Sequence, residues 1–575
     1  MRPRVTSVAL TSGKKITPSD NVTLIVGPNN VGKSAVLAGV HHEITQVPWA
    51  PVQPPSGPVE SVRVTLPDLT GMTDLIANRA KLTPPGSYSY GNFQEHTYVF
   101  DNGATLPQSR FVDSVSRSDH FGELAAGMVT FLGPEGRGNI LGSQGVPDLT
   151  AHQSRSPMQL LWTDRELEKR VDEYMFRAFG KHVVVNRHAG SNVHLQIGVV
   201  QEPEPRIGET SPYLDEILAL PHLHQQGAGM QAFMGTIMTL ATGSFDILLI
   251  DEPETFLHPP QARLLGEIVA EMSKETGLQV LAATHSDDFV QGVIAGSKDN
   301  SDVAIVRITR PADDENHTAQ IEPAAIKALY ADPLLRFSKI MDGIFYKGVV
   351  LCEAESDCTY YSATLGHLEA SEHLSSSDLL FAQCGGKDRL AKAHTSLNAA
   401  AVPTAVIADI DMLANKAKFK ELFETMGGDF ASIEASYNVL DSSVANQRVQ
   451  PERSLVSIRS QEVLSSGDQK FLIKSEIEEL RNLIKAESGW RQIKGKGAGS
   501  IDSGDPTNAF NSIIAACKNV GLFVLTVGEL ERFHPDVSGN KQEWLRKVLE
   551  TNKYRHSSEA QELLHEVLGW IASKQ

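Results

Sequence analysis

The stretch Val22-Thr-Leu-Ile-Val-Gly27-Pro-Asn-Asn-Val-Gly32-Lys33-Ser34 predicts how the first half of this chain folds. An apolar, β-branched run, typical of a buried strand, leads into the spacing G-x-x-x-x-G-K-S of a phosphate-binding loop and then a helix. The glycines let backbone N–H groups point into one concavity, and the helix start adds its positive end. The residues expected around the phosphates of ATP are Gly27, Pro28, Asn29, Asn30, Val31, Gly32, Lys33 and Ser34. Lys33 is expected to reach the β and γ phosphates, and Ser34 to bind Mg²⁺.

The composition predicts a soluble protein of two or three domains, because 575 residues are too many for one core. No run of uninterrupted apolar residues approaches the length of a membrane span, and Val5–Leu10 is too short for the core of a signal peptide. We therefore expect a cytoplasmic protein without a membrane partner. The four cysteines lack C-x-x-C spacing, which argues against a disulfide framework or a cysteine zinc site.

The net charge of −18 would ordinarily weaken binding to nucleic acid. Two local basic runs could still attract an anion. They are Lys416, Lys418 and Lys420, and Arg481, Lys485, Arg491, Lys494 and Lys496.

A second strand signal, Ile247-Leu-Leu-Ile, is followed by Asp251-Glu252-Pro-Glu254. In a parallel sheet such a strand delivers its carboxylates to the edge where ligands bind. Asp251 is expected to hold Mg²⁺, and Glu252 to position or deprotonate the attacking water. A further apolar strand, Leu278–Ala283, places His285 where it could hydrogen-bond a γ-phosphate.

Two weaker signals accompany these motifs. Gly227 and Gly229 precede a helical run and form an anion-binding helix start. Arg137 follows the apolar strand 128–132 and is a candidate to face the nucleotide.

In their order along the chain, these segments resemble the ATP-binding-cassette ATPases. The segment Asp251-Glu-Pro-Glu-Thr-Phe-Leu-His-Pro259 resembles the corresponding segment in one branch of this family. That branch contains structural-maintenance-of-chromosomes (SMC), recombination and overcoming-lysogenization-defect (OLD) proteins. The resemblance implies a dimer in which Gly227 and Gly229 of one subunit complete the ATP site of the other. Ala228 stands where many relatives have serine, and no clear Q-loop glutamine follows Phe131, so slow or absent ATP turnover is expected.

In the second half, carboxylates again follow apolar strands. Glu353 and Asp357 follow a strand near residues 347–352, and Asp409 and Asp411 follow the strand 403–408. Like charges gathered at one sheet edge repel one another unless a cation binds. Oxygen ligands favour Mg²⁺ or Mn²⁺, and a pair of such ions can clamp a phosphodiester during hydrolysis.

This half resembles the topoisomerase–primase (Toprim) domain, in which Glu353 matches the strand-end glutamate and Asp409 and Asp411 match the Asp-x-Asp pair. Ala354 replaces the usual glycine. The segment containing Lys494 and Lys496 is similar to the family's lysine–glycine segment, and Lys496 is preferred as the catalytic lysine. By the same resemblance, Glu529 and Glu531 are candidate ligands of a second metal.

An ATPase half joined to Toprim resembles the OLD family of ATPase–nucleases. We expect an α/β fold with an ATPase domain at 1–335 that includes accessory or dimerisation helices at 140–225. A Toprim domain at 345–535, with a helical insertion at 412–515, should follow. C-terminal helices are expected at 540–575. The expected function is an ATP-regulated, metal-dependent DNA endonuclease or nickase in bacterial antiphage defence. It would act as a homodimer or tetramer through the ATPase domain, with a further defence component as a possible partner. The main alternative is an ATP-binding sensor of DNA or protein that does not cleave. Strand passage or primer synthesis, the other uses of Toprim, is a third possibility.

Overall fold

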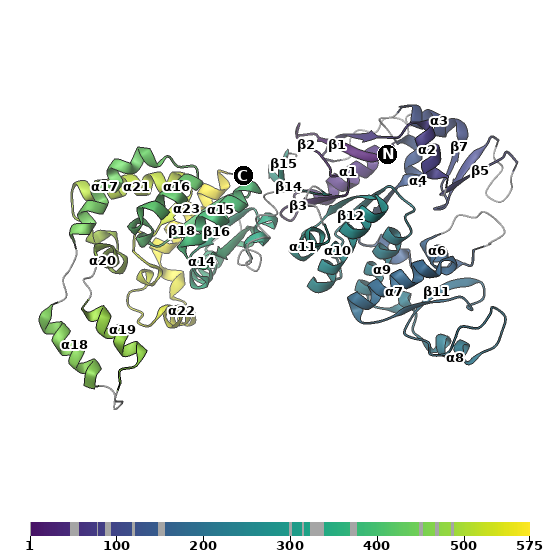
Figure 1. Ribbon diagram of the computed structural model, residues 1–575. Coiled ribbons are helices and arrows are strands. Elements are labelled where there is room, and N and C mark those ends of the chain that lie inside the picture. Colours follow the sequence, from purple (N-terminus) through teal and green to yellow (C-terminus); the bar gives the residue numbers. More distant parts are fainter. Residues whose placement is uncertain are drawn as a thin grey trace. The chain divides into compact units, whose positions relative to one another are not determined.

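The chain divides into two compact units, Met1–Lys327 and Ala328–Gln575, each of which is described by itself (Figure 1). The computed structural model describes residues 2–46, 57–77, 79–86, 94–117, 121–147, 156–297, 302–312, 315–321, 339–368, 376–447, 452–465, 471–484 and 488–574.

The first unit is built on a six-stranded sheet with the order β15-β14-β3-β13-β12-β8. Its strands are β3 (Val22–Val26), β8 (Val129–Leu132), β12 (Ile247–Asp251), β13 (Gln279–Ala283), β14 (Val303–Ala312) and β15 (Glu315–Ile321). All neighbours pair in parallel except β14 with β15. Every residue of β3, β12 and β13 is buried, as their continuous apolar runs predict. The carboxyl ends of these three adjacent strands therefore meet at one edge.

Helices and smaller sheets surround this sheet. The helices that bear on the candidate site are α1 (Lys33–Thr45), α5 (Gly136–Asn139), α9 (Ala228–Ala241), α10 (Pro259–Thr276) and α11 (Asp287–Gly296). Toward the N-terminus lie β1 (Arg4–Leu10), β2 (Lys15–Ile16), β4 (Val59–Thr65), α2 (Leu69–Ile76), β5 (Ala80–Thr83), β6 (Thr97–Phe100), β7 (Thr105–Pro107), α3 (Gln108–Arg117) and α4 (Ala125–Met128). β1, β2 and β4 form one antiparallel sheet, and β5, β6 and β7 form another.

The region predicted to hold accessory helices contains a sheet as well. Its elements are β9 (Gln144–Gly145), α6 (Pro157–Thr163), α7 (Arg165–Phe179), β10 (Val183–Asn186), β11 (Asn192–Ile197), α8 (Pro212–Ala219) and the 3-10 turn η2 (Leu223–Gln225). The Asp164 side chain accepts hydrogen bonds from the N–H groups of Glu166 and Leu167 and so starts α7.

The second unit is built on a parallel sheet with the order β17-β16-β18-β19. Its strands are β16 (Gly348–Cys352), β17 (Leu379–Gln383), β18 (Thr404–Ala408) and β19 (Leu522–Val524). Between β18 and β19 the described chain is helical: η7 (Ile410–Ala414), α16 (Lys416–Thr425), α17 (Phe430–Asn446), α18 (Arg453–Ser465), α19 (Lys474–Leu483), α20 (Gly489–Lys496) and α21 (Asp505–Asn519). This insertion of about a hundred residues begins after β18 and ends at β19. Because β18 and β19 pair in parallel, the residues that follow each strand lie at the same edge of the sheet.

The last helices belong to the core of this unit. Helices α14 (Glu355–His367), α22 (Lys541–Glu550) and α23 (Ser558–Ala572) bury Tyr360, Trp544, Leu564 and Ile571 in one apolar cluster with β16 and β18. Residues 540–574 are thus an integral part of the second unit. None of the helices in the described ranges combines the length and apolar character that crossing a bilayer requires.

Candidate functional site

The loop after β3 has the backbone of a phosphate-binding loop. Gly27 and Gly32 have positive φ values of 145° and 90°, and a Cβ atom on Gly27 would lie 2.2 Å from the Ile308 carbonyl oxygen. Only glycine fits such a conformation and approach. The Lys33 ammonium donates to the carbonyl oxygens of Gly27 (3.0 Å) and Pro28 (2.9 Å). Lys33 is therefore positioned over the loop at the start of α1.

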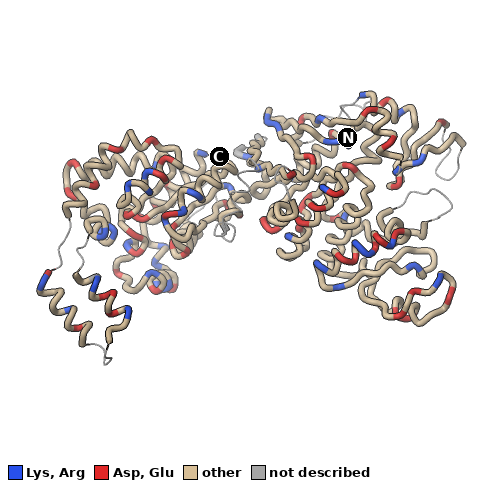
Figure 2. Tube along the Cα trace, viewed as in Figure 1, with Lys and Arg blue, Asp and Glu red and all other residues tan. Residues whose placement is uncertain are grey.

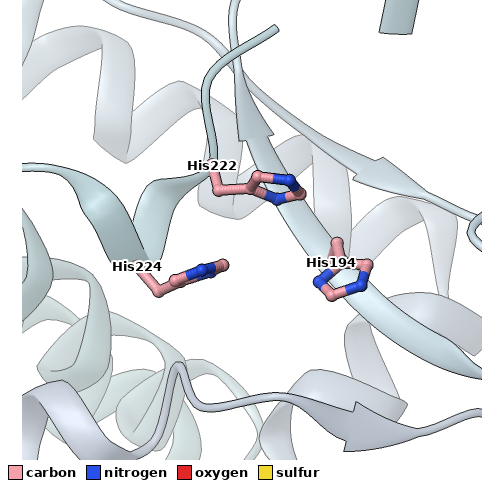
Figure 3. Close-up of side chains that lie close together, drawn as sticks. All are labelled: His194, His222 and His224. Atoms are coloured by element: carbon pink, nitrogen blue, oxygen red, sulfur yellow. The ribbon is translucent and has the colours of Figure 1, made fainter. Parts of the chain in front are cut away.

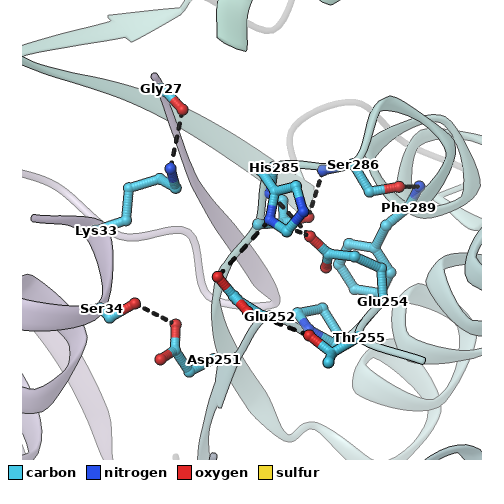
Figure 4. A network of polar contacts seen from close by, with 12 residues as sticks. Gly27, Lys33, Ser34, Asp251, Glu252, Glu254, Thr255, His285, Ser286 and Phe289 are labelled. Atoms are coloured by element: carbon cyan, nitrogen blue, oxygen red, sulfur yellow. Dashed lines mark hydrogen bonds and ion pairs between the residues drawn. The ribbon is translucent and has the colours of Figure 1, made fainter. Parts of the chain in front are cut away.

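Residues from β12 and β13 meet this loop (Figure 4). The Ser34 hydroxyl donates to Asp251 at 2.9 Å, which joins the two predicted Mg²⁺ ligands across 217 residues of sequence. The His285 ring nitrogen Nδ1 lies 3.1 Å from Glu254 and 3.8 Å from Glu252. The structure thus brings Lys33, Ser34, Asp251, Glu252 and His285 to one edge of the sheet.

Burial controls the electrostatics of this edge. It raises the pKa of Asp251, an effect opposed by the hydrogen bond from Ser34 and increased by Glu252. It also lowers the pKa of Lys33, although Glu252, Glu254 and Asp251 act in the opposite direction. Both shifts express the cost of holding charge away from water, and opposite charges brought close together reduce that cost.

Arg137 has a structural role that differs from the predicted contact with the nucleotide. Its side chain is fully buried, and its guanidinium donates to the carbonyl oxygens of Pro253 (2.8 Å), Glu252 (2.8 Å) and Asp251 (3.3 Å). Glu252 and Phe256 in this segment have φ values of 48° and 69°, which non-glycine residues adopt at an energetic cost. Arg137 therefore holds a strained acidic segment in place.

The predicted glycines at the start of α9 differ in their surroundings. A Cβ on Gly229 would lie 2.3 Å from the Phe256 carbonyl oxygen, so glycine is needed there for packing against the acidic segment. Gly227 precedes the helix and would tolerate a Cβ without contact. Contact of either residue with ATP stays a prediction.

Three carboxylates converge at the carboxyl edge of the second sheet. Single oxygens of Glu353, Asp409 and Asp411 all lie within 4.8 Å of one another. Burial, followed by the charges of Asp409 and Asp411, raises the pKa of Glu353 to about 7. Burial also raises the pKa of Asp409. The strand ends after β16 and β18 thus bring together three of the four carboxylates that the sequence predicted at this edge.

Lysines partly neutralise this cluster. The Lys494 ammonium lies 2.8 Å from Asp409 and 3.3 Å from Asp411, and Lys387 lies 3.3 Å from Asp411. Burial alone would lower the pKa of Lys494, but Asp409 and Asp411 raise it above its ordinary value. Lys494 makes these contacts, whereas Lys496, the lysine preferred from the sequence, is exposed. The sequence reading did not assign Lys387, although it follows a Gly-Gly pair behind β17.

Close backbone packing explains how Lys494 reaches the cluster. A Cβ on Gly528 would lie 2.2 Å from the Lys494 carbonyl oxygen, and the Ala498 N–H donates to the Thr526 carbonyl oxygen at 2.8 Å. The Ile410 N–H in turn donates to the Gly528 carbonyl oxygen at 3.0 Å. The segment after β19 therefore connects the end of α20 to the residues that follow β18.

The remaining predicted metal ligands lie outside the three-carboxylate cluster. Asp357 instead accepts from the Ala354 N–H at 2.9 Å and pairs with Lys541 at 2.7 Å, so it starts α14 rather than joining the cluster. Burial, followed by the charge of Glu531, raises the pKa of Glu529, and Lys494 and Asp409 also act on it. Glu529 is thus electrostatically linked to the cluster.

The first basic run is locally neutralised. Lys416 pairs with Glu434, Lys418 with Asp388, and Lys420 with Glu424. Lys485 of the second run lies outside the described residues. Basic and acidic residues are interspersed along both units (Figure 2). The run at 416–420 therefore does not form the free positive patch that its sequence suggested.

Models of known protein families match a segment in each of the two units. Residues 182–290 match an AAA domain model described as a putative AbiEii toxin of a type IV toxin–antitoxin system. Residues 344–411 match the overcoming lysogenization defect protein-like TOPRIM domain, a range that includes Glu353, Asp409 and Asp411.

Two curated relatives carry the name OLD nuclease. One, from Escherichia phage P2, is 27% identical over 173 residues, covering 29% of this chain and 28% of the relative. The other, from Thermus scotoductus, is 23% identical over 345 residues, covering 52% of this chain and 62% of the relative. The chain therefore spans less than two thirds of the length of either relative.

Solved structures similar to the chain include SMC head domains. The domain from Thermotoga maritima gives a TM-score of 0.28 at 15% identity, covering 56% of this chain and all of that one. An SMC head bound to part of ScpA, derived from Pyrococcus furiosus, gives a TM-score of 0.33 at 12% identity, covering 57% of this chain and 99% of that one.

The sheets, motifs and family matches define a class of protein in which a P-loop ATPase is joined to a Toprim domain. The chain joins a segment similar to an AAA ATPase domain to one similar to the OLD-like TOPRIM domain, and it is similar over part of its length to the two OLD nucleases.

Proposed function

We propose that this protein is an ATP-regulated, divalent-metal-dependent endonuclease or nickase that acts on DNA. The observation that carries the proposal is the convergence of Glu353, Asp409 and Asp411 with Lys494 beside them. We further propose that it serves in antiphage defence as a homodimer or tetramer formed through the ATPase unit, together with another defence component.

The acidic cluster fits a divalent cation. Asp411 Oδ1 is buried and has no hydrogen-bond partner, and the raised pKa of Glu353 reflects repulsion that a cation would relieve. Glu353, Asp409 and Asp411 would hold Mg²⁺ or Mn²⁺, with Glu529 as the candidate ligand for a second ion. When bound, such an ion stabilises the negative charge that develops on a phosphodiester during hydrolysis.

The lysines would act beside the carboxylates. Lys494 is held between Asp409 and Asp411, and its positive charge would assist in neutralising the scissile phosphate. Lys387 pairs with Asp411 and would orient that carboxylate. Both side chains bring positive charge to a cluster that would otherwise repel DNA.

The first unit would bind Mg²⁺ and ATP. Lys33 would exchange its carbonyl contacts for the phosphates, while Ser34 and Asp251 would hold the ion. Glu252 and His285 would orient water and the γ-phosphate. The strain at Glu252 is consistent with a functional residue held in a fixed orientation.

Incubation of the purified full chain with supercoiled plasmid, with Mg²⁺ or Mn²⁺ and with or without ATP, tests this function. Nicked or linear product that requires a divalent ion supports it, and intact plasmid under every condition contradicts it. ATP-dependent association with DNA but without scission would support the alternative of a sensor. The pairing of Asp409 and Asp411 with lysines favours this alternative, because it lowers the electrostatic need for an ion.

Substituting Lys33 by Ala is expected to weaken ATP binding at least about 100-fold, because it removes the positive charge aimed at the phosphates. The effect of ATP on cleavage should disappear, while Mn²⁺ binding to the second unit is retained. Nucleotide titration and plasmid assays of the same preparation measure both. Equal cleavage with and without ATP in both proteins would contradict coupling between the two sites.

Cation binding to the cluster is expected to strengthen as pH rises through about 7. Glu353 must lose its proton to bind a cation, and its pKa of about 7 means that the proton is largely present at pH 6. Calorimetric Mn²⁺ titrations in buffers of different ionisation enthalpy should record roughly one proton released at pH 6 and almost none at pH 8.5. Glu353→Gln should abolish this release, and an unchanged release in that variant would contradict the assignment.

A further inference from the structure

A second group of potential metal ligands lies in the accessory region of the first unit. His194, His222 and His224 each offer a ring nitrogen, and these atoms all lie within 4.8 Å of one another. The ring centroid of His222 lies 5.0 Å from that of His194 and 5.0 Å from that of His224. Figure 3 shows the three rings gathered around a common space.

The backbone holds this arrangement in place. Gln196 and His222 form an antiparallel bridge, and the Ile197 N–H donates to the Pro221 carbonyl oxygen at 2.9 Å. The buried Gln196 side chain also donates to the Ile217 carbonyl oxygen at 2.6 Å. His222 and His224 are two residues apart and lie beside β11, which carries His194. The histidines are therefore positioned by the fold rather than by chance contact of flexible side chains.

The chemistry of the three rings suits a transition metal. His222 Nδ1 is buried and has no hydrogen-bond partner, and among the ion pairs found in the described residues none includes these histidines. Burial and mutual proximity lower the pKa of His194 and of His222, which favours the neutral imidazole that binds metal. Zinc bound by three histidines and one water is a common arrangement, with ligand nitrogens about 3.3 Å apart at tetrahedral geometry. A small closure of the rings would reach that spacing.

We propose that His194, His222 and His224 form a binding site for a zinc-class divalent transition metal. This site is separate from the carboxylate cluster and does not depend on the proposed nuclease function. Its ligands precede Gly227 and the start of α9. The Gln231 side chain on α9 donates to the carbonyl oxygens of His224 (3.0 Å) and Gln226 (2.7 Å), so a bound metal would stiffen the approach to this helix.

Binding of Zn²⁺ and Co²⁺ to the full chain, after removal of metal by a chelator, tests the proposal. Three imidazoles and a water give Co²⁺ a tetrahedral environment with strong visible absorption, whereas oxygen ligands in octahedral geometry give a weak spectrum. The wild-type protein and Asp409→Asn should both give the tetrahedral spectrum. A spectrum lost in Asp409→Asn, or absent from the wild type, would overturn the proposal.

Matched substitutions locate the metal. His224 is exposed, so His224→Gln should fold normally yet weaken zinc binding at this site at least about tenfold and reduce the stoichiometry by one. His96→Gln, at another exposed histidine of the same unit, should leave both unchanged. Zinc should also slow amide hydrogen exchange in residues 222–230 of the wild type and of His96→Gln, but not of His224→Gln. Unchanged stoichiometry and exchange in His224→Gln would overturn the assignment.

Discussion

Asp409→Asn is expected to reduce metal-dependent plasmid cleavage by about 10³-fold or more while ATP binding remains unchanged. The substitution preserves shape but removes the negative charge that lies closest to Lys494, at 2.8 Å. A neutral amide at a buried carboxylate position weakens the cation site and leaves Lys494 with Asp411 as its partner. Initial rates of nicking at saturating Mn²⁺ measure the loss, and nucleotide titration measures the retained function.

Asp505→Asn is the matched control because Asp505 is an exposed aspartate of the same unit, at the start of α21. It should cleave at the wild-type rate. Thermal unfolding of both variants separates loss of the site from loss of the fold. If Asp409→Asn cleaves plasmid at an undiminished rate, the acidic cluster is not the nuclease site, whatever the ATPase unit does.

The two sheets and the acidic strand ends could be predicted because each depends on local sequence. Continuous apolar runs such as Val22–Val26 and Ile247–Ile250 predict buried parallel strands, and the residues that follow them must lie at a common edge. The pairing of Ser34 with Asp251 follows from that geometry alone. The same reasoning brings Glu353 together with Asp409 and Asp411.

Side-chain roles that depend on packing between distant segments could not be predicted. Lys494 and Lys496 are equivalent in a sequence motif, and it is Lys494, whose backbone packs closely against Gly528, that reaches Asp409. Asp357 was assigned to the metal because it follows a strand, yet its place in the first turn of α14 directs it to the Ala354 N–H and to Lys541. His222 and His224 are two residues apart in the sequence, but nothing local indicates that His194, about thirty residues earlier on β11, lies beside them.

Arg137→Met is expected to destabilise the ATPase unit by about 3 kcal/mol or more. The guanidinium is buried and donates to the carbonyl oxygens of Pro253, Glu252 and Asp251, and methionine would leave these acceptors without that partner. The positive φ values of Glu252 and Phe256 add strain that the arginine contacts now restrain. Urea unfolding of the full chain, followed through the transition of the first unit, measures the change.

A comparison of stability with nucleotide affinity distinguishes this structural role from the contact with ATP that the sequence first indicated. Arg206→Met, at an exposed arginine of the same unit, should leave stability within about 0.5 kcal/mol of the wild type. If Arg137 is structural, its loss lowers the free energy of unfolding even without ATP, and the relaxed Glu252 segment then weakens nucleotide binding indirectly. If instead Arg137→Met unfolds like the wild type but binds ATP poorly, the guanidinium must leave its carbonyl partners to contact the phosphates. The acidic segment would then be held in its strained conformation by its own backbone contacts with β13 and α9, such as the hydrogen bond from the Glu252 N–H to the Ala283 carbonyl oxygen at 2.8 Å.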